Sequence, residues 1–182
     1  MNSRLKTSRL LLRGFQLADA DEVQRLAGEW DVAKTTLNIP HPYTLEDAEV
    51  WINSHETAWN NREGAIFAIE SLDFGNLLGA VGLTLHNTEG VLGYWIGKPY
   101  WGRGYCTEAA KAVISFGFEC LALDRIGSEH LQSNVASGRV MVKAGMRYLN
   151  PVWKPDRHGK TVQIETYEIA NPNNPLERPA VV

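Results

Sequence analysis

The sequence has few cysteines that could form disulfide bonds and lacks the apolar segments that would place a protein in a membrane. It contains only two cysteines, Cys106 and Cys120, and no long apolar run or apolar N-terminal signal segment. Such absences argue against a disulfide-rich secreted module and against a transmembrane helix. We therefore expect a chain that works in the reducing environment of the cytoplasm.

An excess of charge of either sign is also missing. The chain has 18 basic and 21 acidic residues, a net charge of -3, so no overall field attracts nucleic acid or an anionic membrane, and we expect neither partner. The five histidines and two cysteines lack metal-ligand spacing, so we expect no metal site. No pattern specifies a homodimer, and that arrangement stays open.

The length suits one domain with a substantial buried core. We expect a single domain over residues 1–182. Its ordered part spans about 7–170, and the Pro- and Asn-rich segment 171–182 reads as a loosely ordered tail.

The most informative stretch reads as a strand, a glycine loop and a helix. Residues 93–97 include the β-favouring Tyr94, Trp95 and Ile96, and from about Cys106 apolar residues recur at helical spacing. The first turn of such a helix leaves backbone N–H groups unpaired and favours anions. Gly102 and Gly104 would let a phosphate approach that backbone, with Arg103 beside them.

The remaining chain predicts a mixed sheet. Strands are expected at 7–15, 65–70, 77–86 and 124–131, with a final hairpin of 146–153 and 161–169. Helices are expected from residue 18, from 44 with Thr44 as the N-cap, and over 134–144, whereas 28–43 reads as irregular. The strand at 124–131 must run parallel to 93–97, because a helix crosses over between them.

A dinucleotide site of the Rossmann type is a weaker reading of the same loop. Asp124 follows Gly104 at a suitable distance for a ribose-binding acid, but Thr107 stands where the third glycine belongs. A predicted antiparallel meander, instead of βαβ repeats, also precedes the loop.

Three segments resemble signatures of the GNAT acetyltransferase superfamily. Trp101-Gly102-Arg103-Gly104-Tyr105-Cys106, followed by Thr107-Glu108-Ala109, resembles its motif A, with departures at Trp101 and Cys106. The segment 7–13 resembles the opening T-x-R-L-x-L-R, and Asn134 to Ser137 with Lys143 to Met146 resembles N-x-x-S and K-x-G-F/M. Together they are typical of the RimJ/RimL-like branch, the ribosomal-protein-alanine N-acetyltransferases.

The resemblance implies a fold, a co-substrate and a reaction. The fold would be α/β (α+β) and GNAT-like, a mixed and mostly antiparallel sheet of six to seven strands with about four helices. Acetyl-CoA would donate its acetyl group directly to a primary amine, either a protein N-terminal α-amine or a small-molecule amine. The residues expected to hold acetyl-CoA are Trp95, Ile96, Gly97, Gly102, Arg103, Gly104, Tyr105, Cys106, Thr107, Asn134 and Lys143.

Catalytic and acceptor residues follow less directly from the resemblance. It implies Ser137 as the acid that protonates the thiolate, and an oxyanion donor among the backbone N–H groups around Trp95 and Ile96. Many relatives carry a glutamate where this chain has Val91, so the alternatives for the base are Glu89, Glu129, His130 or a water relay.

Two loop residues are expected near the acceptor, and one other function also fits the sequence. His41 and Tyr43 lie in an aromatic-rich segment that the resemblance places near the acceptor. Cys106 is not expected to act as a nucleophile, since acetyl transfer in this family is direct. Because Val91 replaces the family glutamate, a catalytically inactive acyl-CoA-binding or sensing module is the rival reading.

Overall fold

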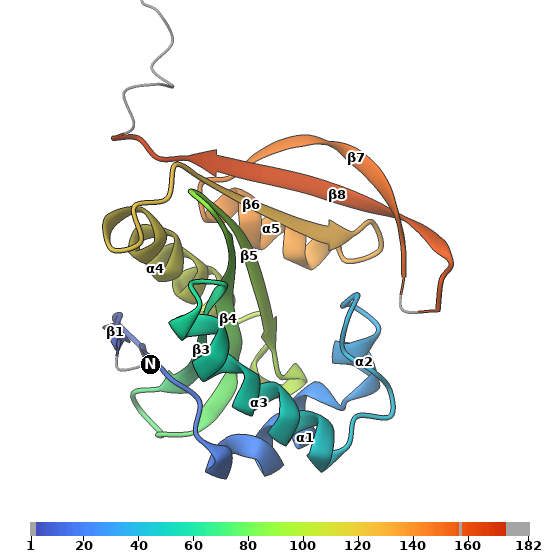
Figure 1. Ribbon diagram of the computed structural model, residues 1–182. Coiled ribbons are helices and arrows are strands. Elements are labelled where there is room, and N and C mark those ends of the chain that lie inside the picture. The colour runs from blue at the N-terminus through green and yellow to red at the C-terminus, as the bar shows by residue number, and fades with distance from the viewer. Residues whose placement is uncertain (1–2, 157, 174–182) are drawn as a thin grey trace, which may run out of the picture.

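A computed structural model describes residues 3–156 and 158–173 and shows one sheet flanked by helices (Figure 1). The eight strands lie in the order β1-β2-β3-β4-β5-β6-β8-β7. The expected tail lies outside the described residues from 174 onward. The strands are β1 (Leu5–Lys6), β2 (Leu10–Arg13), β3 (Gly64–Ser71), β4 (Leu77–His86), β5 (Glu89–Ile96), β6 (Arg125–Leu131), β7 (Arg147–Pro155) and β8 (Thr161–Ala170).

In the described part of the chain, five α-helices and two short 3-10 turns connect these strands. The helices are α1 (Ala20–Ala27), α2 (Trp30–Ala33), α3 (Leu45–Asn60), α4 (Tyr105–Glu119) and α5 (Val135–Lys143), with 3-10 turns at Leu17–Asp19 and Lys98–Tyr100. Thr44 caps α3 as expected, because its side chain accepts a hydrogen bond from the Asp47 N–H, and the Asp47 carboxylate accepts one from the Thr44 N–H.

The number of elements exceeds the expectation of six to seven strands and about four helices. The segment expected as one strand over 7–15 is divided, because the Thr7 N–H bonds to the Leu10 carbonyl at 2.9 Å in a turn between β1 and β2. Within 28–43, expected to be irregular, α2 forms a single helical turn. A helix of four residues is too short to show a hydrophobic period in the sequence.

The mixed sheet is confirmed, and its one parallel pair produces the central feature of the fold. β5 and β6 run parallel, as expected, but they pair only from Glu89–Leu92 against Arg125–Ser128. Beyond these residues β5 stays with β4 while β6 stays with β8. Figure 1 shows β5 and β6 diverging from their shared start, so one edge of β5 loses its neighbour.

Helices cover the sheet on both faces. α4 packs Val113 and Phe116 onto the larger cluster, which includes Phe67 and Leu83 of the sheet. α1 and α3 pack onto the other face through Val23, Leu26 and Ile52, among others. No helix within the described residues is both long and apolar enough to cross a membrane.

Candidate active site

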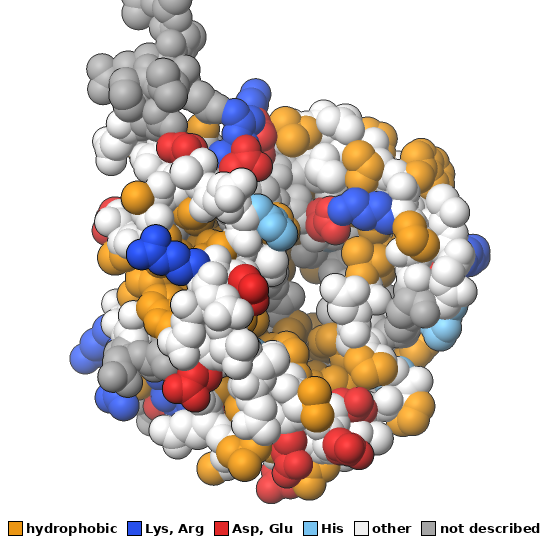
Figure 2. Space-filling view, in the orientation of Figure 1, with side chains coloured by type: hydrophobic (Ala, Val, Ile, Leu, Met, Phe, Trp, Pro, Cys, Tyr) orange, Lys and Arg blue, Asp and Glu red, His pale blue; other side chains and the backbone are white. Residues whose placement is uncertain are grey.

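The divergence of β5 and β6 opens a cleft of about 840 Å³. Its lining comes from β4, β5, β6, the loop before α4, the start of α5 and residues 35–39 after α2. Figure 2 shows the hollow near the centre of this face. The expected site residues that line the cleft are Trp95, Ile96, Gly102, Gly104, Tyr105, Cys106, Thr107, Glu129, Asn134, Ser137 and Lys143.

The loop between β5 and α4 has the backbone that its glycines predict. Gly102 has φ +74° and Gly104 has φ +79°, in the left-handed region that glycine adopts without strain. A Cβ atom on Gly102 would meet nothing within 4 Å, so the loop leaves open space there. Gly104 is the N-cap of α4 and supplies no side-chain hydrogen bond to the first turn. The first-turn N–H groups of α4 are thus left to an anionic ligand.

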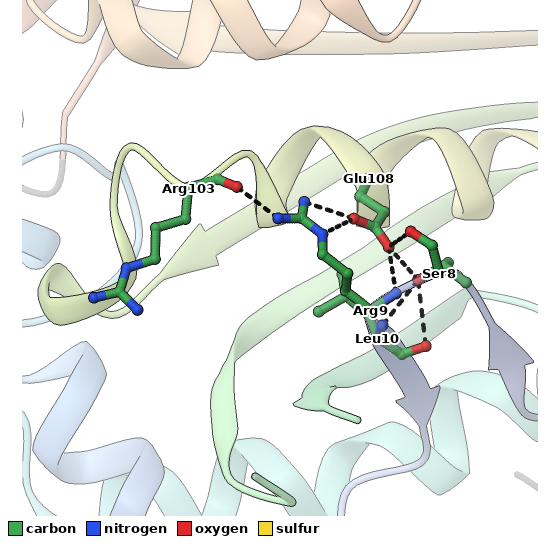
Figure 3. A network of polar contacts seen from close by, with 6 residues as sticks. Ser8, Arg9, Leu10, Arg103 and Glu108 are labelled. Carbon is green, nitrogen blue, oxygen red and sulfur yellow. Dashed lines mark hydrogen bonds and ion pairs between the residues drawn. The ribbon is translucent and has the colours of Figure 1, made fainter. Parts of the chain in front are cut away.

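Glu108, in the first turn of α4, is held by the N-terminal segment (Figure 3). Its carboxylate accepts hydrogen bonds from the hydroxyls of Thr7 at 2.6 Å and Ser8 at 2.9 Å, and from the Arg9 backbone N–H at 2.9 Å. The Arg9 guanidinium adds an ion pair at 2.7 Å. Partial burial opposes ionisation, but these donors prevail and lower the pKa of Glu108 to about 2.

Arg9 connects this network to the glycine loop. Its Nη1 donates to the backbone carbonyl of Arg103 at 3.0 Å, and its guanidinium lies 4.6 Å from the centre of the Tyr105 ring. The Arg103 side chain points away from the network in Figure 3. Arg9 therefore holds the backbone of the glycine loop in place, while the charged side chain of Arg103 is exposed at the surface.

The free edge of β5 offers backbone N–H groups to the cleft. The Gly97 N–H donates to Leu78 of β4 at 2.9 Å, and successive peptide groups of a strand alternate in direction, so the Trp95 backbone also faces β4. The Ile96 carbonyl faces the other way and accepts the Trp101 indole N–H at 2.6 Å. The Ile96 N–H shares that direction and points into the opening. Of the two expected oxyanion positions, Ile96 fits the geometry, whereas Trp95 contributes its side chain to the lining.

Ser137 and Tyr94 form a hydroxyl pair across the cleft. The Ser137 Oγ donates to the Tyr94 phenol at 2.9 Å, and the phenol donates to the Ser137 carbonyl at 3.0 Å. Burial raises the pKa of Tyr94, although the hydrogen bond from Ser137 works in the opposite direction. Tyr94 consequently stays a neutral phenol with a proton to give.

Cys106 lies beside this pair, in the first turn of α4. Burial raises the pKa of its thiol, so the thiolate is disfavoured despite the helix terminus.

Asn134 uses both ends of its side-chain amide within the protein. Its Oδ1 accepts the Ser137 N–H at 3.2 Å and caps α5, and its Nδ2 donates to the Thr35 carbonyl at 3.2 Å. The start of α5 is thereby tied to the segment after α2 across one end of the cleft.

Position along the strands, and not the face of the sheet, separates the two glutamates considered as bases. Gly127 pairs with Val91, so Glu129, two residues further along β6, lies on the same face as Val91. Glu129 lines the cleft and Val91 is 40% exposed there. Glu89 begins β5, is exposed and does not line the cleft.

Four other expected residues also lie away from the cleft lining. His41 packs its ring 5.0 Å from that of Trp30, and Tyr43 packs against the α1–α3 core. Gly97 faces α1, where a Cβ atom would lie 2.5 Å from Leu26. The fourth, Arg103, presents its backbone to Arg9, as described above.

Two candidate site positions, Tyr94 and Arg9, were not identified from the sequence. The sequence pattern placed Tyr94 only in a strand. The signal that could have identified it is a tyrosine hydroxyl on the strand next to the glycine loop. The role of Arg9 could not be read from spacing, because its partner Glu108 lies far along the chain. In the described part of the chain, no group of three or more His, Cys, Asp or Glu side chains could hold a metal ion.

Comparison with known proteins decides the family. The model of the acetyltransferase (GNAT) domain matches residues 9–147, from Arg9 through the glycine loop and α5. The chain belongs to the GNAT acetyltransferase family. GNAT acetyltransferases use acetyl-CoA as the acetyl donor, so this chain is an acyltransferase enzyme that carries out acetyl-CoA-dependent N-acetylation.

Individual GNAT relatives cover most of the chain. Uncharacterized N-acetyltransferase YnaD of Bacillus subtilis is 31% identical over 144 residues, which span 79% of this chain and 82% of the relative. A GNAT-family acetyltransferase from Bacillus anthracis superposes with a TM-score of 0.82 at 25% identity, covering 93% of this chain and 99% of the other.

A second solved structure shares the fold. The ribosomal-protein-S5-alanine acetyltransferase from Vibrio fischeri superposes with a TM-score of 0.82, covering 94% of this chain and 98% of its own. At 15% identity this likeness shows the fold alone, and the RimJ/RimL-like resemblance rests on the sequence signatures.

Proposed function

We propose that the enzyme acetylates the α-amine at the N-terminus of a peptide or protein, by direct attack of the amine on the thioester of acetyl-CoA. One observation carries the proposal: the glycine loop, the free edge of β5 and the Ser137–Tyr94 pair line one continuous cleft. A coenzyme anchored at the loop and extended along β5 would bring its thioester to the hydroxyl pair.

The anchor is the turn around Gly102 and Gly104 with the first turn of α4. Its positive-φ glycines and open space fit a pyrophosphate, and the helix N-terminus favours negative charge. Arg139 and Lys143 of α5 also line the cleft and suit the phosphates of CoA. The fit rests on backbone groups, so the departures at Trp101 and Cys106 do not impair it.

The reaction needs an oxyanion donor and an acid. The amine nitrogen forms a bond to the thioester carbonyl carbon, and the developing oxyanion accepts the Ile96 N–H. When the carbon–sulfur bond breaks, the thiolate takes a proton from the Ser137–Tyr94 pair, and the nitrogen loses its proton to Glu129 or to water. An amide and free CoA result.

An α-amine suits this modest set of groups. Its pKa of about 7.7–8.0 leaves a substantial neutral fraction near pH 7.5, whereas lysine near 10.4 requires a stronger base. Positioning then supplies most of the catalysis. The Vibrio fischeri neighbour, by its name an acetyltransferase of a ribosomal protein, supports the same class of acceptor.

Release of free CoA tests this proposal against the inactive-module alternative. That alternative draws on Val91, which faces the cleft where many relatives carry a glutamate. The assay supplies acetyl-CoA and a peptide that begins with alanine. The control peptide has a blocked α-amine and contains lysine. We expect CoA release with the first peptide and not with the control. Coenzyme binding without release, for every amine tried, would establish the inactive module.

A further inference from the structure

The described residues supply one acidic side chain to the cleft. Among its described lining residues, Glu129 is the only aspartate or glutamate, and the lining cations Arg139 and Lys143 both belong to α5. Asp31 of α2 does not line the cleft and is paired with Lys34 and Lys98. One negative charge therefore faces any cationic acceptor.

Glu129 already has a partner in the free protein. Lys154 reaches from β7, beyond the intervening strand β8, and places its Nζ 2.5 Å from the Glu129 carboxylate. The Lys154 side chain is 46% exposed and that of Glu129 is 28% exposed. An ion pair this open to water stabilises the fold little and exchanges easily.

We propose that the ammonium group of the acceptor replaces Lys154 at Glu129, and that this exchange selects acceptors with one positive charge. The inference rests on the proposed function and narrows its substrate class. The Lys154 ammonium and an acceptor ammonium are the same chemical group, so both satisfy the carboxylate with the same hydrogen-bond geometry. Glu129 thus binds the acceptor nitrogen until that nitrogen loses its proton.

The surroundings of Glu129 define the rest of the acceptor. Val91, Ile66 and Trp51 line the same side of the sheet and carry no charge. Gly93 leaves open space opposite Gly82, since a Cβ atom on Gly93 would meet nothing within 4 Å. A peptide N-terminus with a short uncharged first side chain fits this floor.

Polyamines and aminoglycosides do not fit the same charge pattern. Each brings several ammonium groups, and only the first finds a carboxylate among the described lining residues. The others would lie near the uncharged 35–39 segment, at a desolvation cost without a compensating ion pair. The structure thus favours monocationic acceptors over polycations.

Steady-state kinetics on four forms of the full chain test the exchange. An alanine-initiated peptide and spermidine serve as acceptors for the wild type, Lys154→Met, Glu129→Gln and the double variant. Lys154→Met should lower the KM for the peptide by up to about fivefold with kcat nearly unchanged, because it removes the competing ammonium. Glu129→Gln should raise that KM by about tenfold, and the double variant should match Glu129→Gln alone.

The controls separate this inference from the proposed function. Lys111→Met removes one exposed charge from α4 and should leave the KM unchanged, and thermal unfolding checks that each variant folds. An unchanged or raised KM in Lys154→Met, or spermidine used as efficiently as the peptide, would reject the exchange while wild-type turnover stands. A wild type without turnover would reject the proposed function and the exchange with it.

Discussion

The Ser137 Oγ and the Tyr94 phenolic oxygen lie 2.9 Å apart, and the phenol also donates to the Ser137 carbonyl. Each hydroxyl thus orients the other, and the pair can deliver one proton to a leaving thiolate. Residues that act as such a unit have non-additive effects on catalysis.

Removing either hydroxyl should therefore slow turnover. We expect Ser137→Ala and Tyr94→Phe each to lower kcat by about 10²-fold, while CoA affinity measured by calorimetry stays near that of the wild type. The double variant should be no slower than the slower single variant. An unchanged rate in Ser137→Ala would remove that residue from the mechanism, and multiplying effects would show that the hydroxyls act separately.

Gly104 should be required for coenzyme binding more than for folding. Its φ of +79° is unfavourable for any side chain, and the loop backbone must come close to the pyrophosphate. We expect Gly104→Val to weaken CoA binding by about tenfold or more in calorimetry, from backbone strain of about 1–2 kcal/mol and lost access.

Gly75 provides the matched control for that substitution. It has φ +67° with open space around it, in the turn between β3 and β4, and does not line the cleft. Gly75→Val should carry a similar backbone strain yet leave CoA affinity intact. Equal losses of affinity in both variants would show that strain alone, and not the loop, weakens binding.

Glu108 should make stability depend on acidic pH. Its folded pKa of about 2 lies below the ordinary glutamate value of 4.5, so its contribution to stability is full above about pH 4.5 and disappears as the pH falls toward 2. We expect Glu108→Gln to lose about 1–2 kcal/mol at pH 7 and to flatten this acid limb in denaturant titrations. Glu119→Gln, at the exposed end of the same helix, should keep the wild-type limb.

His55 should make stability depend on pH in a higher range than Glu108 does. Burial against Trp51 and Phe15 lowers its pKa from 6.5 to about 4, and its two ring nitrogens have no hydrogen-bond partner. The unfolded chain then binds a proton first, so stability should fall by about 1–2 kcal/mol between pH 7.5 and 5. His55→Phe should remove that slope, while His86→Gln, at an exposed position, should not. A slope that persists in His55→Phe would assign it to another group.

Local patterns predicted the anchor of the site well. The strand, the Gly102–Gly104 turn and the helix depend on neighbouring residues, and all three occur in the structure, with α4 beginning at Tyr105. The helix over 134–144 was likewise predicted from local residues, and Asn134 caps it, because a short polar side chain before a helix can accept a hydrogen bond from the first turn.

Long-range relationships could not be read in the same way. Nothing local indicates that Glu108 would meet Thr7 and Arg9, or that Lys154 would reach Glu129. The choice between Glu89 and Glu129 depended on where β5 and β6 separate, which a sequence pattern does not reveal. His41 was predicted for the acceptor wall from its aromatic neighbourhood, but those rings pack on each other.

The contact of Thr7 and Arg9 with Glu108 also has a consequence for synthesis. During translation residues 7–9 are made long before α4, so the two sides of this contact can meet only after the intervening chain has been synthesised. A nascent chain that stops short of α4 should therefore be unable to hold its coenzyme. A deletion of residues 1–9 should loosen the glycine loop before α4, because it removes the other side of the same contact.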